Sequence, residues 1–134
     1  MLVYSSFEKS RISELASIFI DLAPALHSIN RRLVDLLPLA RQHYYHPEMK
    51  GSWSIKAVLP TIAPDLKYDE LEVGNGGEAQ NAYSEIVHPD TLDVRKHELT
   101  VGLRDYCTLD TLAMVKLAWF FEGRKANRVE KYAK

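Results

Sequence analysis

The stretch from Arg104 to Phe121 constrains the fold of this chain more than any other part of the sequence. It contains strong helix formers and no Gly or Pro, which predicts a helix. From Leu109 onward, its only polar residues are Asp110, Thr111 and Lys116. Because a helix that is apolar on most sides is buried on most sides, we expect the rest of the chain to pack around it.

Asp110 is expected to enter the interior of the protein on this helix. Tyr106 lies one helical turn earlier, so the phenol and the carboxylate share one face. A buried carboxylate is costly unless it is paired, hydrogen-bonded or bound to a metal. The structural interpretation is that Asp110 caps a helix or accepts a hydrogen bond from a neighbouring hydroxyl. The functional interpretation is that it forms part of a site with Tyr106.

Length and composition indicate one domain, or one piece of a domain, of 134 residues with a formal net charge of −1. With 46% hydrophobic residues, the chain can form a real core, and its charge gives no overall attraction to nucleic acid or membrane. The apolar runs are too short to span a bilayer, so no membrane partner is expected. Cys107 is the single cysteine, and its apolar surroundings predict a small core residue in a cytoplasmic protein.

Two short apolar runs predict strands at Leu2–Ser5 and Leu33–Leu36. The segment between them is long enough for a helical crossover, so the strands can be parallel neighbours in a βαβ unit. Ser5 and Glu8 have the spacing of a helix-capping pair. Glu8 in a first helical turn would also interact favourably with the helix dipole. The predicted fold class is therefore α/β and mostly helical, with about two parallel strands and several helices.

The remaining helices are predicted from hydrophobic periodicity and from their start and stop signals. They cover residues 21–30, residues 39–45, residues 55–59 with an end at Pro60, residues 78–87, and a segment that begins at Asp90 or Thr91 and runs through Leu103. Residues 124–134 form a basic tail that we expect to be a solvated helix end.

Four segments, in chain order, resemble motifs of a known superfamily. The last of them, Tyr106-Cys107-Thr108-Leu109-Asp110, resembles the Tyr-x-x-x-Asp motif of DEDD (DnaQ-like) 3′–5′ exonucleases of the tyrosine branch, which have a ribonuclease H-like fold. Residues 3–8 resemble that superfamily's middle motif, a strand that ends in Asn-x-x-Phe-Asp. Residues 34–41 resemble the following Asp-Thr-Leu-x-Leu-Ala-Arg segment, and residues 51–58 resemble the Ser-Leu-Lys-x-Val helix after it. The nearest relative is expected to be an uncharacterised bacterial domain-of-unknown-function family within this superfamily.

The chain departs from the superfamily pattern at two places. Tyr4 stands where the middle motif has Asn, and Glu8 stands where it has Asp. The first motif, an Asp-x-Glu on an opening strand, is absent from the sequence. The resemblance therefore implies that residues 1–123 are the C-terminal portion of a ribonuclease H-like exonuclease domain, truncated so that the opening strands are lacking.

The resemblance also assigns functional residues. Nucleases of this kind hold two divalent cations about 4 Å apart, which activate a water and stabilise the leaving oxygen. Glu8 and Asp110 would be the metal ligands for Mg²⁺ or Mn²⁺, and Tyr106 would be the catalytic residue that orients the attacking water. Lys50, Ser54 and Lys56 would contact nucleic acid. Without the Asp-x-Glu acids, we expect the metals to bind weakly or not at all and the isolated chain to be inactive.

Two alternatives belong to other functional classes. The first is a non-catalytic helical interaction module that oligomerises, because a sheet without its opening strands has an unpaired edge at residues 2–5. The second is a nucleic-acid-binding domain that uses Arg31, Arg32, Arg41 and the basic tail, although the near-neutral charge counts against it. Only the exonuclease hypothesis requires the carboxylates of Glu8 and Asp110 to lie within about 8 Å of each other, the reach of a shared cation or bridging waters.

Overall fold

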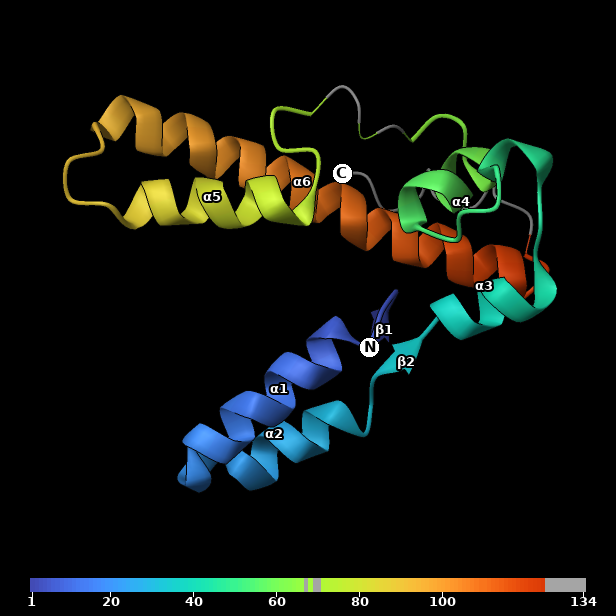
Figure 1. Ribbon diagram of the computed structural model, residues 1–134, viewed down its shortest axis with the longest axis horizontal. Coiled ribbons are helices and arrows are strands. Elements are labelled where there is room, and N and C mark those ends of the chain that lie inside the picture. The colour runs from blue at the N-terminus through green and yellow to red at the C-terminus, as the bar shows by residue number, and fades with distance from the viewer. Residues whose placement is uncertain (67, 69–70, 125–134) are drawn as a thin grey trace.

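The structure of the protein is a computed structural model that describes residues 1–66, 68 and 71–124. Within these residues the chain is α/β and mostly helical (Figure 1). The elements in chain order are β1 (Leu2–Val3), α1 (Phe7–Ile18), η1 (Ile20–Leu22), α2 (Ala23–Asn30), β2 (Val34–Asp35), α3 (Leu37–His43), η2 (Pro47–Met49), α4 (Ile55–Ile62), α5 (Gly76–Val87) and α6 (Asp93–Phe121). Apart from Arg124, the predicted basic tail lies outside the described residues.

The two predicted strands are confirmed as parallel neighbours. In the sheet of β1 and β2, Leu2 lies opposite Val34 and Val3 lies opposite Asp35. The Leu36 amide extends the ladder by donating to the Val3 carbonyl over 2.9 Å. The crossover between the strands is formed by α1, η1 and α2, as the sequence predicts. Each strand is two residues long, and so shorter than expected.

The segment that begins near Asp90 and the Arg104–Phe121 stretch form one continuous helix, α6, of 29 residues. The prediction that Asp90 or Thr91 caps its start was wrong, because Leu92 is the N-cap. The Thr91 hydroxyl instead donates to the Glu85 carbonyl over 2.6 Å and closes the loop after α5. α6 continues through Gly102, which is buried against Val73; a Cβ at this position would lie in van der Waals contact, 3.4 Å from a Val73 methyl.

The apolar half of α6 is buried on one face only, which corrects the expectation of burial on most sides. Ala113 and Leu117 are fully buried, whereas Cys107 and Phe120 are exposed. The elements that contact α6 are α5 along its first part and α4 and β1 farther along the helix (Figure 1). Cys107 is therefore a surface thiol and not the predicted core residue.

The core consists of three clusters along α6, and each includes one of its buried side chains. Their buried members are Leu36, Met49, Val58 and Leu117 in the first cluster, Leu59, Ala63, Tyr68 and Ala113 in the second, and Val73, Ala82 and Leu99 in the third. The first two clusters also explain why α4 continues past Pro60, where the sequence predicts its end. Val58 and Leu59 of α4 are fully buried, α4 contacts α6, and Pro60 itself is exposed.

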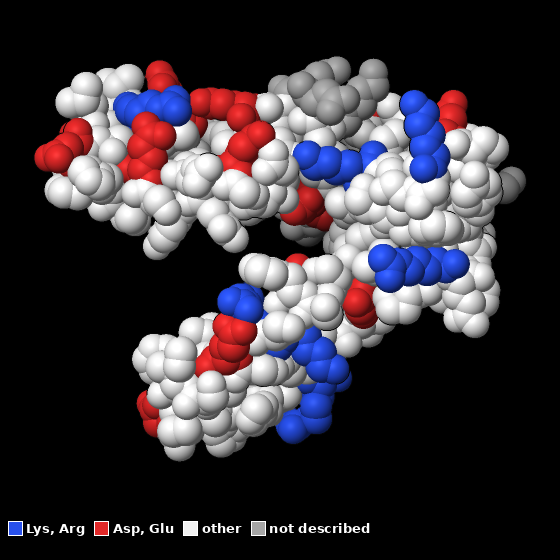
Figure 2. Space-filling view, viewed as in Figure 1, with Lys and Arg blue, Asp and Glu red and all other residues white. Residues whose placement is uncertain are grey.

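Two helical arms extend from the region of the first two clusters. One arm is the hairpin of α1 and α2, and the other is α5 with the first part of α6 (Figure 1). Figure 2 shows an open gap between the two arms. The α1–α2 arm leaves large apolar side chains in solvent, including Ile18 at 67% exposure and Ile20 at 72%. None of the helices in the described part of the chain is long and apolar enough to cross a membrane.

Substitution of Leu117 by Ala tests the role of α6 as the centre of the core. The side chain is fully buried in the first cluster, so its truncation should lower the free energy of unfolding by about 2–5 kcal/mol in urea denaturation. Leu92→Ala is the matched control, because Leu92 is 76% exposed and should cost little. Equal losses in the two variants would contradict this description of the core.

Light scattering tests the predicted association. Exposed apolar side chains on the α1–α2 arm and the outer edge of β1 give the chain surfaces that a second copy can cover. We expect at least a dimer at high micromolar concentration and a shift toward monomer in the Ile20→Ser variant. A stable monomer for the unaltered chain would refute this expectation.

Candidate functional site

Glu8, Tyr106 and Asp110 line one pocket of about 1040 Å³. The pocket lies where β1 and the first turn of α1 meet the loop before α4 and the middle of α6. Glu8 is near the start of the chain and Asp110 is near its end, so the fold brings together acids that are far apart in the sequence. Ser54, at the N-cap of α4, lines the same pocket.

Asp110 accepts a short hydrogen bond from the buried Tyr68. The Tyr68 hydroxyl donates to Asp110 Oδ1 over 2.6 Å. Burial and the hydrogen bond to Asp110 together raise the pKa of Tyr68, so its hydroxyl remains a donor at neutral pH. The structural interpretation of Asp110 predicted that it accepts a hydrogen bond from a neighbouring hydroxyl, and this contact is present. It also fixes one oxygen of a carboxylate that lines the pocket.

Tyr106 lies beside this pair. Its ring centroid is 6.3 Å from that of Tyr68, and both rings belong to the second cluster of the core. Burial raises the pKa of Tyr106 to about 12, and the nearby carboxylate of Asp110 adds to this effect. A smaller contribution comes from the charge of Glu8, which is consistent with a position close to the phenol. Tyr106 is therefore a protonated hydrogen-bond donor at neutral pH.

Glu8 is held by the chain just before it. The Ser5 hydroxyl donates to Glu8 Oε2 over 3.2 Å and accepts from the Phe7 amide over 3.1 Å. The predicted pairing of Ser5 with Glu8 is thus present, although Ser6 is the N-cap of α1. The arrangement orients an exposed carboxylate at the rim of the pocket.

The two lysines assigned to nucleic acid do not line the pocket. Lys50 ends η2 in a left-handed backbone conformation, with φ of 49°, at the turn before Gly51. Lys56 follows the start of α4, and its Nζ lies 5.7 Å from the ring centroid of Tyr68. The cation–π contact with Tyr68 gives Lys56 a structural partner next to the Asp110 hydrogen bond.

Sequence reasoning missed two residues of the site, Tyr68 and Tyr4. Tyr68 follows a loop with no motif, so nothing in the sequence indicated its contact with Asp110. Tyr4 lines the pocket, and its hydroxyl is buried without a hydrogen-bond partner in the described part of the chain. Burial raises the pKa of Tyr4 to about 12, against the opposing effect of the Arg41 charge. The sequence contained one sign that Tyr4 belongs to the site, which is its place in the segment that resembles the middle motif.

The donor set of the pocket suits a hard divalent cation but is sparse. Carboxylate oxygens are the ligands that Mg²⁺ and Mn²⁺ prefer. Among the described residues, however, no group of three His, Cys, Asp or Glu side chains could hold a metal ion. A cation held by Glu8 and Asp110 would therefore need water or substrate for its other ligands.

Substitution of Tyr68 by Phe tests the contact that fixes Asp110. Loss of the hydroxyl leaves the part-buried Asp110 carboxylate without the hydrogen bond from Tyr68, so we expect the free energy of unfolding to fall by about 1–3 kcal/mol in urea denaturation at pH 7. The control is Tyr83→Phe, because Tyr83 is an exposed tyrosine on α5. The contact would have no structural role if both variants had the same stability.

Comparison with known proteins links the chain to an uncharacterised domain family. Residues 1–54 match the family described as Domain of unknown function (DUF2779). This match includes Glu8 and Ser54 but ends before Tyr68, Tyr106 and Asp110.

A longer similarity relates the chain to the uncharacterised protein UU173 of Ureaplasma parvum serovar 3. The two sequences are 30% identical over 139 residues, which cover 90% of this chain and 20% of the relative. The chain thus spans about a fifth of the length of that protein. No solved structure matches the chain. The match of residues 1–54 therefore supports the expected relationship to a domain-of-unknown-function family.

Proposed function

We propose that this chain is the C-terminal portion of a DnaQ-like 3′–5′ exonuclease domain with a truncated ribonuclease H-like fold. It would carry the middle and last acidic motifs of a site for metal-dependent phosphodiester hydrolysis. The observation that supports the proposal best is the shared pocket of Glu8, Tyr106 and Asp110. A protein without such a function has little reason to gather two acids in one place, because like charges repel and destabilise each other.

Each side chain has a distinct role in this proposal. Asp110 would bind the cation through its pocket-facing side, while Tyr68 holds Oδ1 in place. Tyr106 would orient the attacking water through its protonated phenol, whose raised pKa keeps the proton at neutral pH. Glu8 would complete the cation site directly or through water. A bound Mg²⁺ or Mn²⁺ would supply Lewis-acid stabilisation of the phosphate oxygens.

The charge of the pocket sets a limit on activity. Two carboxylates cannot balance two divalent cations, and near-octahedral Mg²⁺ geometry needs several well-placed oxygen ligands. We therefore propose weak cation binding and little or no hydrolysis by the chain alone. Activity would require further acids on a strand that pairs with the outer edge of β1.

Electron paramagnetic resonance of Mn²⁺ tests the cation site. We expect weak binding by the unaltered chain and at least a fivefold loss of affinity in the Glu8→Gln and Asp110→Asn variants. Glu48→Gln is the control, because it removes the same charge from an exposed residue of η2 that does not line the pocket. Equal Mn²⁺ affinity in Asp110→Asn and the control would exclude Asp110 as a ligand and remove the main support for the proposal.

The second candidate function is a non-catalytic helical interaction module. The observation in its favour is the apolar surface on the α1–α2 arm, where Ile18 and Ile20 are largely exposed. This function predicts association that depends on Ile20 and is unaffected by Asp110→Asn. Light scattering on the two variants, read together with the Mn²⁺ titration, separates it from the nuclease proposal, because association without Mn²⁺ binding supports the interaction module alone.

A further inference from the structure

The arm formed by α1 and α2 packs against itself and has almost no core of its own. Both helices make their main contacts with each other and with η1. Asn30 links the end of α2 to α1, because its Nδ2 donates to the Lys9 carbonyl over 3.1 Å and to Ser13 Oγ over 2.9 Å. Within α1, η1 and α2, all of whose residues the structure describes, Ala16 is the only buried residue. The arm is therefore a braced hairpin whose remaining surface is uncovered.

Large apolar side chains are exposed along this arm and gather at its tip. Contiguous apolar surface of this kind marks sites where a partner binds. The arm is also slightly basic, because residues 6–33 contain four Lys or Arg and three Asp or Glu. The exposed apolar residues are Phe7, Leu15, Ile18, Phe19, Ile20 and Leu22. A partner that covers this arm should therefore offer apolar side chains and negative charge.

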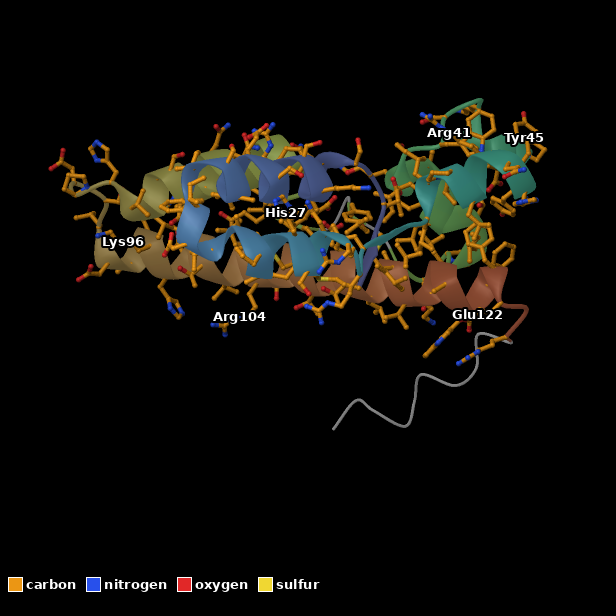
Figure 3. The ribbon with its side chains drawn as sticks, turned by 90° about the horizontal axis from the view of Figure 1, so that it is seen from below. His27, Arg41, Tyr45, Lys96, Arg104 and Glu122 are labelled. Carbon is orange, nitrogen blue, oxygen red and sulfur yellow. The ribbon has the colours of Figure 1, made fainter. Side chains whose placement is uncertain are left out.

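The face across the open gap has both properties. Seen along the line that joins the two arms, α1 lies over α5 and α2 lies over the first part of α6 (Figure 3), and α1 and α5 are both 12 residues long. Uncharged side chains of α5 border the gap (Figure 2), and Tyr83 and Val87, one helical turn apart on α5, are exposed. Residues 76–105 contain six Asp or Glu and three Lys or Arg, so this arm is net negative. An α1–α2 arm therefore complements this face in length, apolar character and charge.

The protein's own α1–α2 arm is held away from this face. Short connections join its two ends to β1 and β2, and the Leu36 amide extends the ladder of these strands by donating to the Val3 carbonyl. At the start of α1, the Ser5 hydroxyl accepts from the Phe7 amide over 3.1 Å. These contacts fix the base of the arm and keep the gap open. The arm of a second molecule is not restrained in this way and can enter the gap from its open end.

We propose that the gap binds the α1–α2 arm of a second copy of this chain, and that the inserted arm packs its exposed apolar side chains against Tyr83 and Val87. With two-fold symmetry, each copy inserts its arm into the gap of the other, so association stops at a dimer. This arrangement covers the apolar surface of both arms and brings their opposite charges together. The inference rests on the second candidate function, to which it adds the surface that the arm binds, and it does not depend on the cation site.

Cross-linking between two single-cysteine variants tests this proposal. In a Cys107→Ser background, which removes the native surface thiol, Leu15→Cys is mixed with Tyr83→Cys and treated with a short bismaleimide. Both positions are exposed and lie in the interior of their helices, so the result does not depend on the direction in which the arm inserts. We expect at least fivefold more mixed covalent dimer than from Leu15→Cys with Tyr45→Cys. Tyr45 is the matched control, because it is exposed and lies at the end of the molecule away from both arms (Figure 3). A tag on one variant separates mixed from same-variant products by mass, and circular dichroism checks that each variant is folded.

The outcomes separate this inference from both proposed functions. Mixed cross-linking in excess of the control supports the inference, whether or not the chain binds Mn²⁺. A dimer in light scattering with no more cross-linking than the control overturns the inference and leaves the interaction module standing, whereas a monomer overturns both. A chain that carries Leu15→Cys and Tyr83→Cys together reports closure of the gap by its own arm. Cross-linking of this chain only within single molecules would also overturn the inference.

Discussion

The packing of one face of α6 is the constraint on which the rest of this structure depends. Leu99, Ala113 and Leu117 each belong to a different cluster of the core, so a single helix connects all three. The sheet has only two residues per strand and cannot organise the fold by itself. The same helix carries Tyr106 and Asp110, and for this reason the core and the candidate site are positioned by one element.

The site lies beside this core and has structural contacts of its own. Tyr68 is buried in the second cluster and also donates to Asp110, so the packing of the cluster controls where the carboxylate lies. The parallel ladder of β1 and β2 precedes Tyr4 and α3 directly in the chain, and so sets their positions. The pocket is therefore lined by β1 and the first turn of α1, by residues 37–55, and by the middle of α6.

Local patterns in the sequence predicted the parts of the fold that are determined locally. The strands, the crossover and the contact between Ser5 and Glu8 depend on short-range spacing, and the structure contains them. The exposure of Cys107 could not be predicted, because it depends on how many neighbours cover α6 and not on the helix itself. Tyr68 was missed for a related reason, since its contact with Asp110 joins residues from two distant elements and follows no motif. From the sequence, the segment through Leu103 and the stretch from Arg104 are described separately, whereas both belong to the single helix α6.

The central claim is that Glu8 and Asp110 form one cation site beside Tyr106. Anomalous diffraction from crystals soaked in Mn²⁺ tests it most directly, since it locates the ion and both carboxylates together. The account predicts one weakly occupied Mn²⁺ position between Glu8 and Asp110, with the carboxylates within about 8 Å of each other. Carboxylates that face different parts of the surface, with no Mn²⁺ between them, would contradict the account.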